Sequence, residues 1–528
     1  MQGLVFIKDA IRSAISFLPN KKIFFNFEIF YFVRDHNKMD YLFYSQIEFI
    51  LKRGKGVKAC LFDSESKQII SNLIPLSQFQ DNNFFYFDYI TNKNRTVVEG
   101  MECVVIVRPS SLKAVIEELA CPFYGTYIII FTSQIDPFSL EILANADLKS
   151  IITEVHEINA DLFKQCSRLY TTNSEKYKRV LDGLSSVVLS LEISPNIKVF
   201  DESLFEGYTG PCDSQAELLN KANDKNLKHI GRELKSKSEQ YNFQRKGTFL
   251  LLGRNFDLVT PLVYDWHYQA MIYEHLQADN SLVKINQKEF SLNDTFFSNN
   301  KFVEIATVGE NIKETIKTID KSQLKFANHN FEDVEESIMM KSKMECHLNI
   351  YNTLISECLK SKSLSEYENE IICNKEKVDL KSLVNSLETD QALKLLLVHF
   401  LKWIKNWDES SKEFPKFRSQ ILKYQEIFKP RNFCYKNNFN NEIDIKLGYI
   451  SPLKRIIKHV VHKKLKENAL VNINDEVKDV SPIIIYIEGG VTMREYREAM
   501  QCEQEYNVDI VVVGSEIINS SSILKKIL

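Results

Sequence analysis

The stretch of residues 248–276, TFLLLGRNFDLVTPLVYDWHYQAMIYEHL, limits the possible fold more than any other part of the chain. Residues 249–252 form a short apolar run after Gly247, which is typical of a strand covered on both faces of a parallel sheet. Thr260 is placed to cap a helix, and Pro261 suits its first turn because that position needs no N–H donor. We therefore expect a strand, a loop and a helix. The apolar face of this helix contains Leu262, Trp266, Ala270, Tyr273 and Leu276.

Length, charge and cysteine content limit the number of domains, the kinds of partner and the cellular compartment that we expect. The 528 residues allow three or four domains of about 150 residues each. A formal net charge of −3, with 26% charged residues, gives no general attraction to nucleic acid or to an acidic membrane. The ten cysteines include no CxxC pair and no secretory signal is evident, so we expect reduced thiols in the cytosol.

Strand and helix signals alternate in the N-terminal region. β-rich runs occur at residues 58–63, 84–88, 103–109, 127–132 and 151–157. Stretches such as residues 111–119 suit a crossover helix between two such strands. These signals predict an α/β fold with a doubly wound parallel sheet.

A second α/β pattern is divided between distant parts of the chain. Residues 158–246 have a polar, helical pattern that includes residues 214–241. Residues 482–488 predict a buried strand and residues 508–513 another, with a turn at Gly489 and Gly490 between them. Thr492 and Glu495 have the spacing of a capping box at the start of a helix.

The intervening residues 262–414 contain no proline, which favours a mainly helical region. Residues 393–407 are apolar enough to be buried on nearly all sides. One predicted helical face contains Leu348, Tyr351, Ile355 and Leu359.

The loop after residue 252 resembles the signature of the SM (Sec/Munc) family of SNARE-binding proteins. The matching residues are Arg254, Asp257, Val259, Thr260, Pro261, Leu262, Tyr268, Gln269, Ala270 and Met271. Gly253 and Leu258 differ from the acidic residue and the proline that the family usually has at these positions. Trp266 makes the loop most similar to the vacuolar-protein-sorting forty-five branch, which serves endosomes and the trans-Golgi.

The resemblance extends from about residue 56 to the C-terminus, through ACLFDSESKQIIS, VVIVRPSS, YIIIFT and VVVGSEIINSSS. Residues 3–18 resemble the family's opening helix. The implied fold is an arch of three domains, with two parallel-sheet α/β domains and a large, mainly helical third domain. The implied boundaries are residues 1–135, residues 136–246 with 480–528, and residues 247–479.

The resemblance also implies a function without catalysis, cofactor or metal. We expect a cytoplasmic monomer that binds a syntaxin-type SNARE and the assembled SNARE bundle, and that promotes membrane fusion at Golgi or endosomal membranes. It is attached to these membranes only through SNAREs, and no nucleic acid is expected as a partner. Two alternatives are an SM subunit of a multisubunit tethering complex and a nucleotide-binding α/β enzyme. The absence of GxGxxG and GxxxxGK[ST] motifs counts against the enzyme.

Two binding sites are implied by the resemblance. A syntaxin N-terminal peptide would bind the first domain at Phe131, Leu140 and Leu143, although core packing is the alternative explanation for all three. If Leu143 lies at a pocket rim, Leu143→Arg keeps the domain folded and blocks the peptide.

A helical hairpin in the third domain would contact SNAREs through Met339, Met340 and Met344, because methionine suits a surface that accepts a partner helix. Core packing explains these methionines equally well. Unlike several relatives, the chain has no proline around the expected bend at residues 328–336, so the hinge is expected to be straighter or differently placed.

An unusual insertion near residues 19–55 separates the opening segment from the first strand. Residues 23–33, IFFNFEIFYFV, are far shorter than the ~20 apolar residues that a membrane-spanning helix needs. The insertion is either a lineage-specific segment packed on the sheet edge or a retained intron, because A/T-rich codons encode its Phe, Ile, Lys, Asn and Tyr. We expect residues 21–52 to be dispensable for folding.

Three further features have ordinary structural explanations. Gly489 and Gly490 could hold an anion, but a plain strand-to-helix turn is favoured. His459 and His462 could bind a metal with Cys434, but no further ligand is spaced to complete the site. A basic stripe on the same segment could face acidic lipid or an acidic SNARE, although a solvated face is favoured. The stripe contains Lys454, Arg455, Lys458, Lys463 and Lys464.

Overall fold

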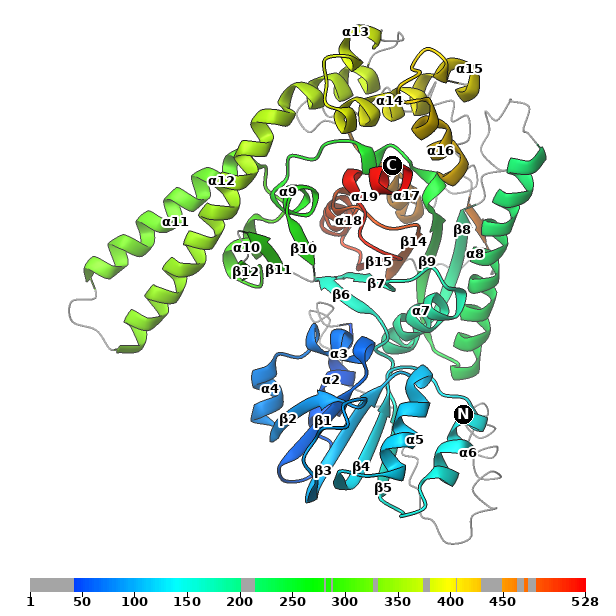
Figure 1. The fold of residues 1–528 in the computed structure, drawn as a ribbon, viewed down its shortest axis with the longest axis vertical. Helices are drawn as coiled ribbons and strands as arrows, with labels where there is room; N and C mark the ends of the chain where they lie inside the picture. The colour runs from blue at the N-terminus through cyan, green and yellow to red at the C-terminus, as the bar shows by residue number, and fades with distance from the viewer. Residues whose placement is uncertain are drawn as a thin grey trace.

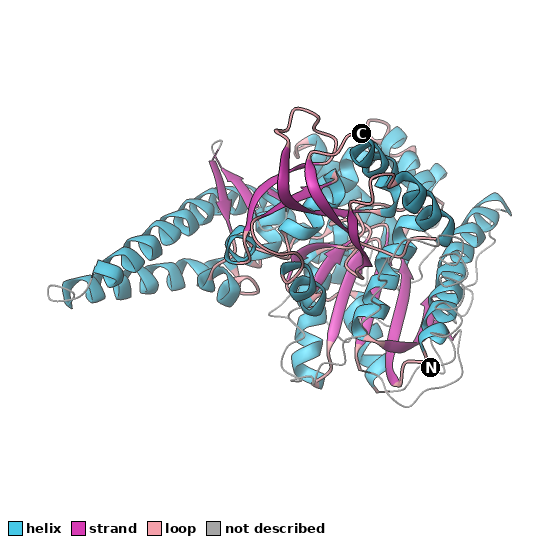
Figure 2. Cartoon of the chain, turned by 90° about the horizontal axis from the view of Figure 1, so that it is seen from below, coloured by secondary structure: helices cyan, strands magenta, loops and turns pink. Residues whose placement is uncertain are grey.

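The computed structural model describes residues 42–200, 214–279, 282–285, 288–325, 331–373, 380–404, 406–428, 449–462, 470–472 and 481–528. A five-stranded sheet lies at one end, a seven-stranded sheet occupies the middle, and helices cover the other end (Figure 1). Two long helices, α11 (Ile305–Lys325) and α12 (Phe331–Cys373), leave the helical part as a hairpin. The hairpin projects well beyond the rest of the molecule in both Figure 1 and Figure 2.

The first sheet has the order β2-β1-β3-β4-β5, and all of its neighbouring strands are parallel. The strands are β1 (Lys58–Phe62), β2 (Phe84–Tyr89), β3 (Val98–Val107), β4 (Tyr124–Phe131) and β5 (Ile152–Glu157). Its helices are α3 (Ser64–Ser71), α4 (Leu76–Asp81), α5 (Leu112–Ala120) and α6 (Pro137–Ala146), with the 3-10 turn η1 (Pro109–Ser111). Apolar clusters cover both faces of the sheet, which explains the uninterrupted apolar runs. The predicted strands and the parallel sheet are confirmed.

The second sheet has the order β13-β8-β9-β14-β15-β7-β6. Its strands are β6 (Phe163–Cys166), β7 (Leu169–Thr171), β8 (Ile193–Phe200), β9 (Arg245–Gly253), β13 (Leu470–Asn472), β14 (Ile483–Glu488) and β15 (Ile510–Gly514). The helices around it are α7 (Tyr177–Leu191), α8 (Ser214–Tyr241) and α18 (Met493–Tyr506), while α19 (Ser520–Ile527) packs against the helical part. Because β14 pairs with β9, and β15 with β7, the late strands complete a sheet whose strands β6 to β9 end by residue 253, so this sheet is built from two distant parts of the chain.

Two of the expected domain boundaries fall within sheets and need correction. A division after residue 135 removes β5 from the first sheet, where it pairs with β4. A division after residue 246 removes most of β9 from the second sheet, where it lies between β8 and β14. We retain three domains as a proposal, with these two divisions moved to follow β5 and β9.

The remaining residues are mainly helical, as predicted. The helices are α9 (Tyr268–His275), α10 (Thr295–Asn300), α11, α12, α13 (Lys381–Val384), α14 (Thr389–Trp403), α15 (Trp407–Ser411), α16 (Arg418–Phe428) and α17 (Pro452–Val461). A small antiparallel sheet of β10 (Gln277–Asp279), β11 (Leu282–Ile285) and β12 (Lys288–Ser291) interrupts them. Residues 392–401 of α14 are all buried, which confirms the expected burial on every side.

The helix expected to follow Thr260 starts later than predicted. Residues 254–256 and 260–262 form two 3-10 turns, η3 (Arg254–Phe256) and η4 (Thr260–Leu262), and α9 begins only at Tyr268. The Asp257 carboxylate accepts hydrogen bonds from Thr260 N and Thr260 Oγ1. This hydroxyl therefore closes the loop instead of capping a helix, and Leu262 lies outside α9.

The predicted helical face of α12 is only partly buried, because Tyr351 and Ile355 pack against the core whereas Leu348 and Leu359 do not. Leu348 and Leu359 are exposed, whereas Ile350 and Leu354 are fully buried. The buried side continues through Met344, His347, Ser361, Leu364, Ser365 and Glu368. The packing face is therefore rotated relative to the predicted one, and part of α12's apolar surface is left facing solvent.

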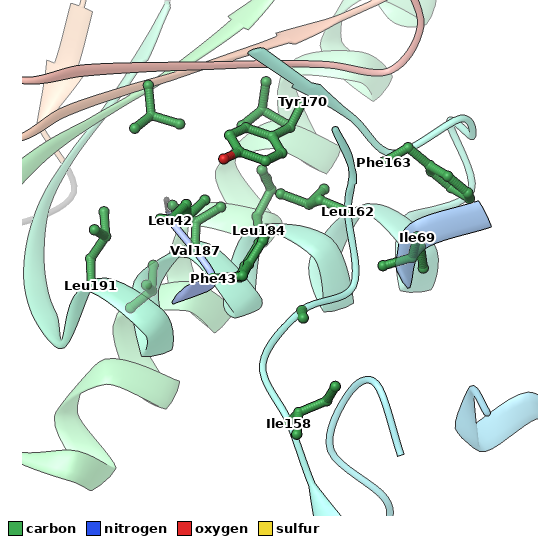
Figure 3. Packing of buried hydrophobic residues seen from close by; sticks show 14 of the residues in the cluster. Leu42, Phe43, Ile69, Ile158, Leu162, Phe163, Tyr170, Leu184, Val187 and Leu191 are labelled. Atoms are coloured by element: carbon green, nitrogen blue, oxygen red, sulfur yellow. The ribbon is translucent and has the colours of Figure 1, made fainter. Parts of the chain in front are cut away.

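Helix α2 (Tyr44–Leu51) lies within the unusual insertion and forms part of a core shared by the two large sheets. Leu42, Phe43, Ile47 and Ile50 are all buried in this cluster. Figure 3 shows Leu42 and Phe43 among side chains of α7 and β7, including Leu184 and Tyr170. Residues 42–50 therefore contribute to the core, which counts against the expectation that residues 21–52 are dispensable for folding. Residues 3–18 and 23–33 lie outside the described residues.

Candidate functional site

The carboxyl edge of the first sheet, where doubly wound folds bind ligands, is filled by an ion network. Arg108 follows β3 and donates two hydrogen bonds to Asp161, each of 3.1 Å. Arg179 of α7 donates to the same carboxylate at 3.0 Å, and Glu65 of α3 accepts from Arg108 at 2.9 Å. Since Asp161 and Arg179 belong to the segment that enters the second sheet, these groups join the two α/β units.

The carboxyl edge of the second sheet is filled in a similar way. Arg254 follows β9 and donates to both carboxylate oxygens of Glu495, at 2.6 and 2.9 Å. Glu495 also closes the predicted capping box with Thr492, so the first turn of α18 is already satisfied. A side chain on Gly489 would lie 2.7 Å from Arg254 Cβ. Gly489 thus accommodates Arg254, whereas a side chain on Gly490 would collide with Ile518. Both contacts support the plain strand-to-helix turn.

The signature loop between β9 and α9 is buried and structural. Asp257 accepts hydrogen bonds from Val259 N and Thr260 N, each at 3.0 Å. Pro261 is buried in η4, and Gln269 Nε2 donates to Cys166 Sγ at 3.7 Å. The signature residues therefore hold the sheet and the helical part together, and they present no open binding surface.

The aromatic residues that follow the signature loop attach α12 to it. Glu368 of α12 accepts a hydrogen bond of 2.9 Å from Tyr264 N, and it forms an ion pair with Lys394 of α14. Trp266 Nε1 donates to Ser365 Oγ at 3.1 Å. The tryptophan that the sequence comparison singled out thus contacts the long hairpin helix directly.

Asp265 attaches the same loop to α18. Its carboxylate lies 3.4 Å from Arg494 Nε and 3.2 Å from an Arg497 nitrogen, and it also bonds to His267. Burial alone raises the pKa of Asp265, but the two arginines outweigh it and hold the pKa well below its usual value. The ionised carboxylate therefore joins α18 to the loop that contacts α12.

Helix α12 has a second buried attachment, at His347. His347 of α12 lies 2.9 Å from Tyr268 OH of α9 through Nδ1, and 2.9 Å from Asp294 Oδ2 through Nε2. Asp294 also caps α10 by accepting from Phe297 N. α12 is therefore fixed at two places, near residue 347 and at residues 361–368, while the part before residue 341 extends beyond them.

The three methionines proposed for SNARE contact divide into two groups. Met339 and Met340 are 56% and 51% exposed, and the neighbouring Ile338 is exposed as well. Met344 is only 3% exposed and belongs to the core around α9 and α11. An exposed apolar group near a projecting helix end is unusual for a surface without a partner. The predicted bend lies partly outside the described residues, and α12 itself begins at Phe331.

The residues proposed for the N-terminal peptide face the core of the first domain. Phe131 is fully buried, Leu143 is 2% exposed, and Leu140 is half-buried against the same cluster. The exposed apolar side chains on α6 are Phe138, at 69%, and Ile142. Sequence reasoning missed these two, although their separation by four residues after the Asp136 cap was a usable signal.

Two features are absent from the described residues. The helices contain no segment long and apolar enough to cross a membrane. No group of three or more His, Cys, Asp or Glu side chains is arranged to hold a metal ion in this part of the chain. His459 is on α17 and His462 packs edge-on against Tyr506, while Cys434, Lys463 and Lys464 lie outside the described residues.

Comparisons with known proteins agree with the geometry. The model of the Sec1 family matches residues 58–526. Vacuolar protein sorting-associated protein 45 of Rattus norvegicus is 23% identical over 90% of this chain and 93% of that protein.

Two solved structures have the same fold. The SM protein Vps45 in complex with the Qa SNARE Tlg2 superimposes with a TM-score of 0.77 at 20% identity, covering 93% of this chain and 97% of that one. Sly1p in complex with an N-terminal peptide of Sed5p gives a TM-score of 0.69 at 14% identity, covering 93% and 98%.

Proposed function

The chain belongs to the Sec1 family, and from this premise we propose that it is an SM protein that binds a syntaxin-type SNARE. In this role it promotes SNARE complex assembly during vesicle transport at endosomes or the trans-Golgi. The carrying observation is the near full-length likeness to Vps45, one solved form of which is bound to a Qa SNARE. The protein acts by binding, and its SNARE partners hold it at the membrane.

The projecting hairpin is the proposed surface for SNARE helices. Ile338, Met339 and Met340 form an exposed apolar group on α12, and unbranched methionine side chains adapt to different partner shapes. Met344 supports this surface from the core. The buried attachments at His347 and Glu368 keep the helix in place, which lowers the ordering cost of binding.

The proposed site for a syntaxin N-terminal peptide is on α6 of the first domain. Phe138 and Ile142 provide exposed apolar contacts beside the half-buried Leu140. Phe131 and Leu143 support this surface from below. The Sly1p structure, which contains an N-terminal peptide of Sed5p, favours a site of this type.

The nucleotide-binding alternative has no structural support, because Arg108 and Arg254 with their acidic partners fill both sheet edges. Calorimetry with ATP, GTP and NAD tests it directly. Micromolar binding of any of these nucleotides would contradict a purely SNARE-binding role.

The positive test uses the purified full-length chain. Cytosolic domains of Qa SNAREs from the trans-Golgi, the endoplasmic reticulum and the plasma membrane are immobilised and compared for capture. We expect selective capture by the trans-Golgi SNARE. Selective capture by another SNARE would reject the proposed compartment, and no capture by any would reject SNARE binding. Stoichiometric co-purification from cells with several tether subunits would favour the alternative of a tethering-complex subunit.

A further inference from the structure

The loop of residues 132–136 joins β4 to α6 and contacts the second α/β unit. Thr132 Oγ1 donates a hydrogen bond of 3.2 Å to Asp161 Oδ1, in the segment that enters the second sheet. Gln134 Nε2 donates one of 2.6 Å to the hydroxyl of Tyr241, the last residue of α8. The loop is therefore held by groups that lie outside the first sheet.

Glu157 holds the same loop from the first sheet. It is the last residue of β5, and its carboxyl group accepts a hydrogen bond of 2.8 Å from Ile135 N. The next residue of the loop, Asp136, caps α6 by accepting from Ser139 N at 2.9 Å. Since α6 begins at Pro137, these contacts fix the start of the helix and the direction of its exposed side chains.

The titratable groups near Glu157 come from α7 and α8. Lys237 and Tyr241 of α8 face Glu157, and burial lowers the pKa of Lys237. The other charged groups around Lys237 are Asp182 and Lys178 of α7 and Glu233 of α8. Burial raises the pKa of Glu157 to about 7, and the hydrogen bond from Ile135 N and the charge of Lys237 offset only part of this effect. The observed loop position therefore favours the neutral carboxyl group, and a position that admits water favours the carboxylate.

We propose that residues 132–136 are a latch between α8 and α6, closed while Glu157 is protonated and opened when Glu157 ionises. In the closed state the second unit holds the start of α6 through Asp161 and Tyr241. Opening lets water reach the carboxylate and frees the start of the helix. The consequence for peptide binding rests on the α6 site proposed above. The peptide binds the closed state, so both the second unit and a proton control its binding.

Proton linkage determines the size of the effect. The pKa of Glu157 is about 7 in the closed state and returns to its usual value of 4.5 when the group is hydrated. Between pH 6 and pH 8 the opening equilibrium should therefore shift about tenfold toward the open state. Glu157→Gln keeps an oxygen acceptor for Ile135 N but cannot ionise, so its opening should not change over this range.

Amide exchange of the full-length chain measures the opening. Fragments that contain residues 132–137 are compared between the wild type and Glu157→Gln at equal pH, so that intrinsic exchange rates cancel. We expect the increase of about tenfold from pH 6 to pH 8 only in the wild type, while residues 127–131 of β4 exchange slowly in both proteins. The absence of a pH-dependent difference would overturn the proton control. Equal opening of residues 127–131 would show global unfolding and exclude a latch.

Tyr241→Phe tests the contact with α8. It removes one hydrogen bond to the loop, so the opening of residues 132–136 should increase about fivefold at both pH values. Tyr177→Phe is the matched control, because Tyr177 of α7 stacks on His229 of α8 and its hydroxyl has no hydrogen-bond partner in the described part of the chain. Equal exchange in the two variants would exclude α8 from the latch.

A fluorescent peptide from the N-terminus of the trans-Golgi Qa SNARE separates this inference from the proposed α6 site. Because coupling is reciprocal, bound peptide should slow the opening of residues 132–136, and Phe138→Ala should abolish this effect without changing the pH effect. If the peptide has no effect while the pH effect remains, the latch is supported and the α6 site is wrong. If the peptide slows the opening but Glu157→Gln opens like the wild type at pH 8, the site is supported and the proton control is wrong.

Discussion

Arg254 and Glu495 form a buried ion pair although they lie 241 residues apart in the chain. Arg254 follows β9, and Glu495 lies in the first turn of α18, the helix that follows the neighbouring strand β14. The guanidinium also donates to Asp257 O and Gly490 O, so it contacts three segments at once. The pair therefore fixes the late strands to the middle of the chain and positions the signature loop.

Replacing Glu495 with glutamine tests this role. Glu495→Gln leaves the buried Arg254 guanidinium without its nearest counter-charge, because the Asp257 carboxylate lies farther away, at 3.8 Å. We therefore expect a loss of about 3–5 kcal/mol in the free energy of unfolding. Urea denaturation measures it. The control is Glu289→Gln, which breaks an exposed pair with Lys284 and should have no measurable effect. A change of less than about 1 kcal/mol for Glu495→Gln would show that the pair is not important for stability.

Glu157 should make stability depend on pH near neutrality. Burial raises its pKa to about 7, and the hydrogen bond from Ile135 N offsets only part of this effect. The folded state therefore binds the proton more tightly than the unfolded state does, so the associated stability is present below the unfolded pKa and is lost as the pH rises through about 7. We expect a loss of roughly 1–3 kcal/mol from pH 5 to pH 8.

Glu157→Gln keeps the acceptor for Ile135 N but cannot ionise, so its pH dependence should be flatter and its stability at pH 8 higher than that of the wild type. Denaturation midpoints at pH 5 and pH 8 are the measurement, with Glu141→Gln on the exposed side of α6 as the control. An unchanged pH dependence in Glu157→Gln would assign the effect to another group.

The strands could be predicted from sequence because local pattern and tertiary environment agree there. The run YIIIF in β4 is apolar on both faces. A short run of this kind is typical of a strand that is buried between two layers. Thr492 and Glu495 were predictable for a different reason, since a capping box is complete within four residues.

The helix boundaries and buried faces of the helical part were harder to predict, because they depend on contacts with residues far away in the sequence. The Asp257 carboxylate accepts a hydrogen bond from the Thr260 hydroxyl, so these residues close a loop and α9 starts later in the chain. Local helix propensity does not indicate this contact. On α12, Leu348 and Leu359 satisfy the spacing of a buried face as well as Ile350 and Leu354 do. Only contacts with α9, α11 and α14 decide which side is buried. The exposed Phe138 was missed for the same reason, because exposure is a property of the neighbours.

The burial of Leu143 reverses the expected effect of Leu143→Arg. At 2% exposure the arginine has no path to water, so the charge would be buried without a partner and the domain should lose several kcal/mol of stability. Phe138→Asp, on the exposed side of the same helix, should leave the melting temperature unchanged. Thermal unfolding of the two variants distinguishes core from surface.

Peptide binding completes this comparison. If α6 binds a syntaxin N-terminal peptide, Phe138→Asp should weaken binding of a fluorescent peptide at least tenfold and retain capture by the assembled SNARE bundle. Asn145→Asp, at an exposed position near the other end of α6, is the control for added charge. Wild-type peptide affinity in Phe138→Asp would place the peptide site elsewhere.

Variants of the α12 methionines distinguish core positions from surface positions on the hairpin in the same way. Met339→Asp and Met340→Asp place charge on exposed positions, so folding should be unaffected, while SNARE-driven liposome fusion should slow because a partner helix would bury the charge. Met344→Asp places the charge in the core and should lower the melting temperature. Ser342→Asp, at an exposed position between the two sites, controls for one added negative charge on the hairpin. Fusion at the wild-type rate in Met339→Asp and Met340→Asp, with normal folding, would remove this surface from the mechanism and leave the first domain as the main SNARE contact.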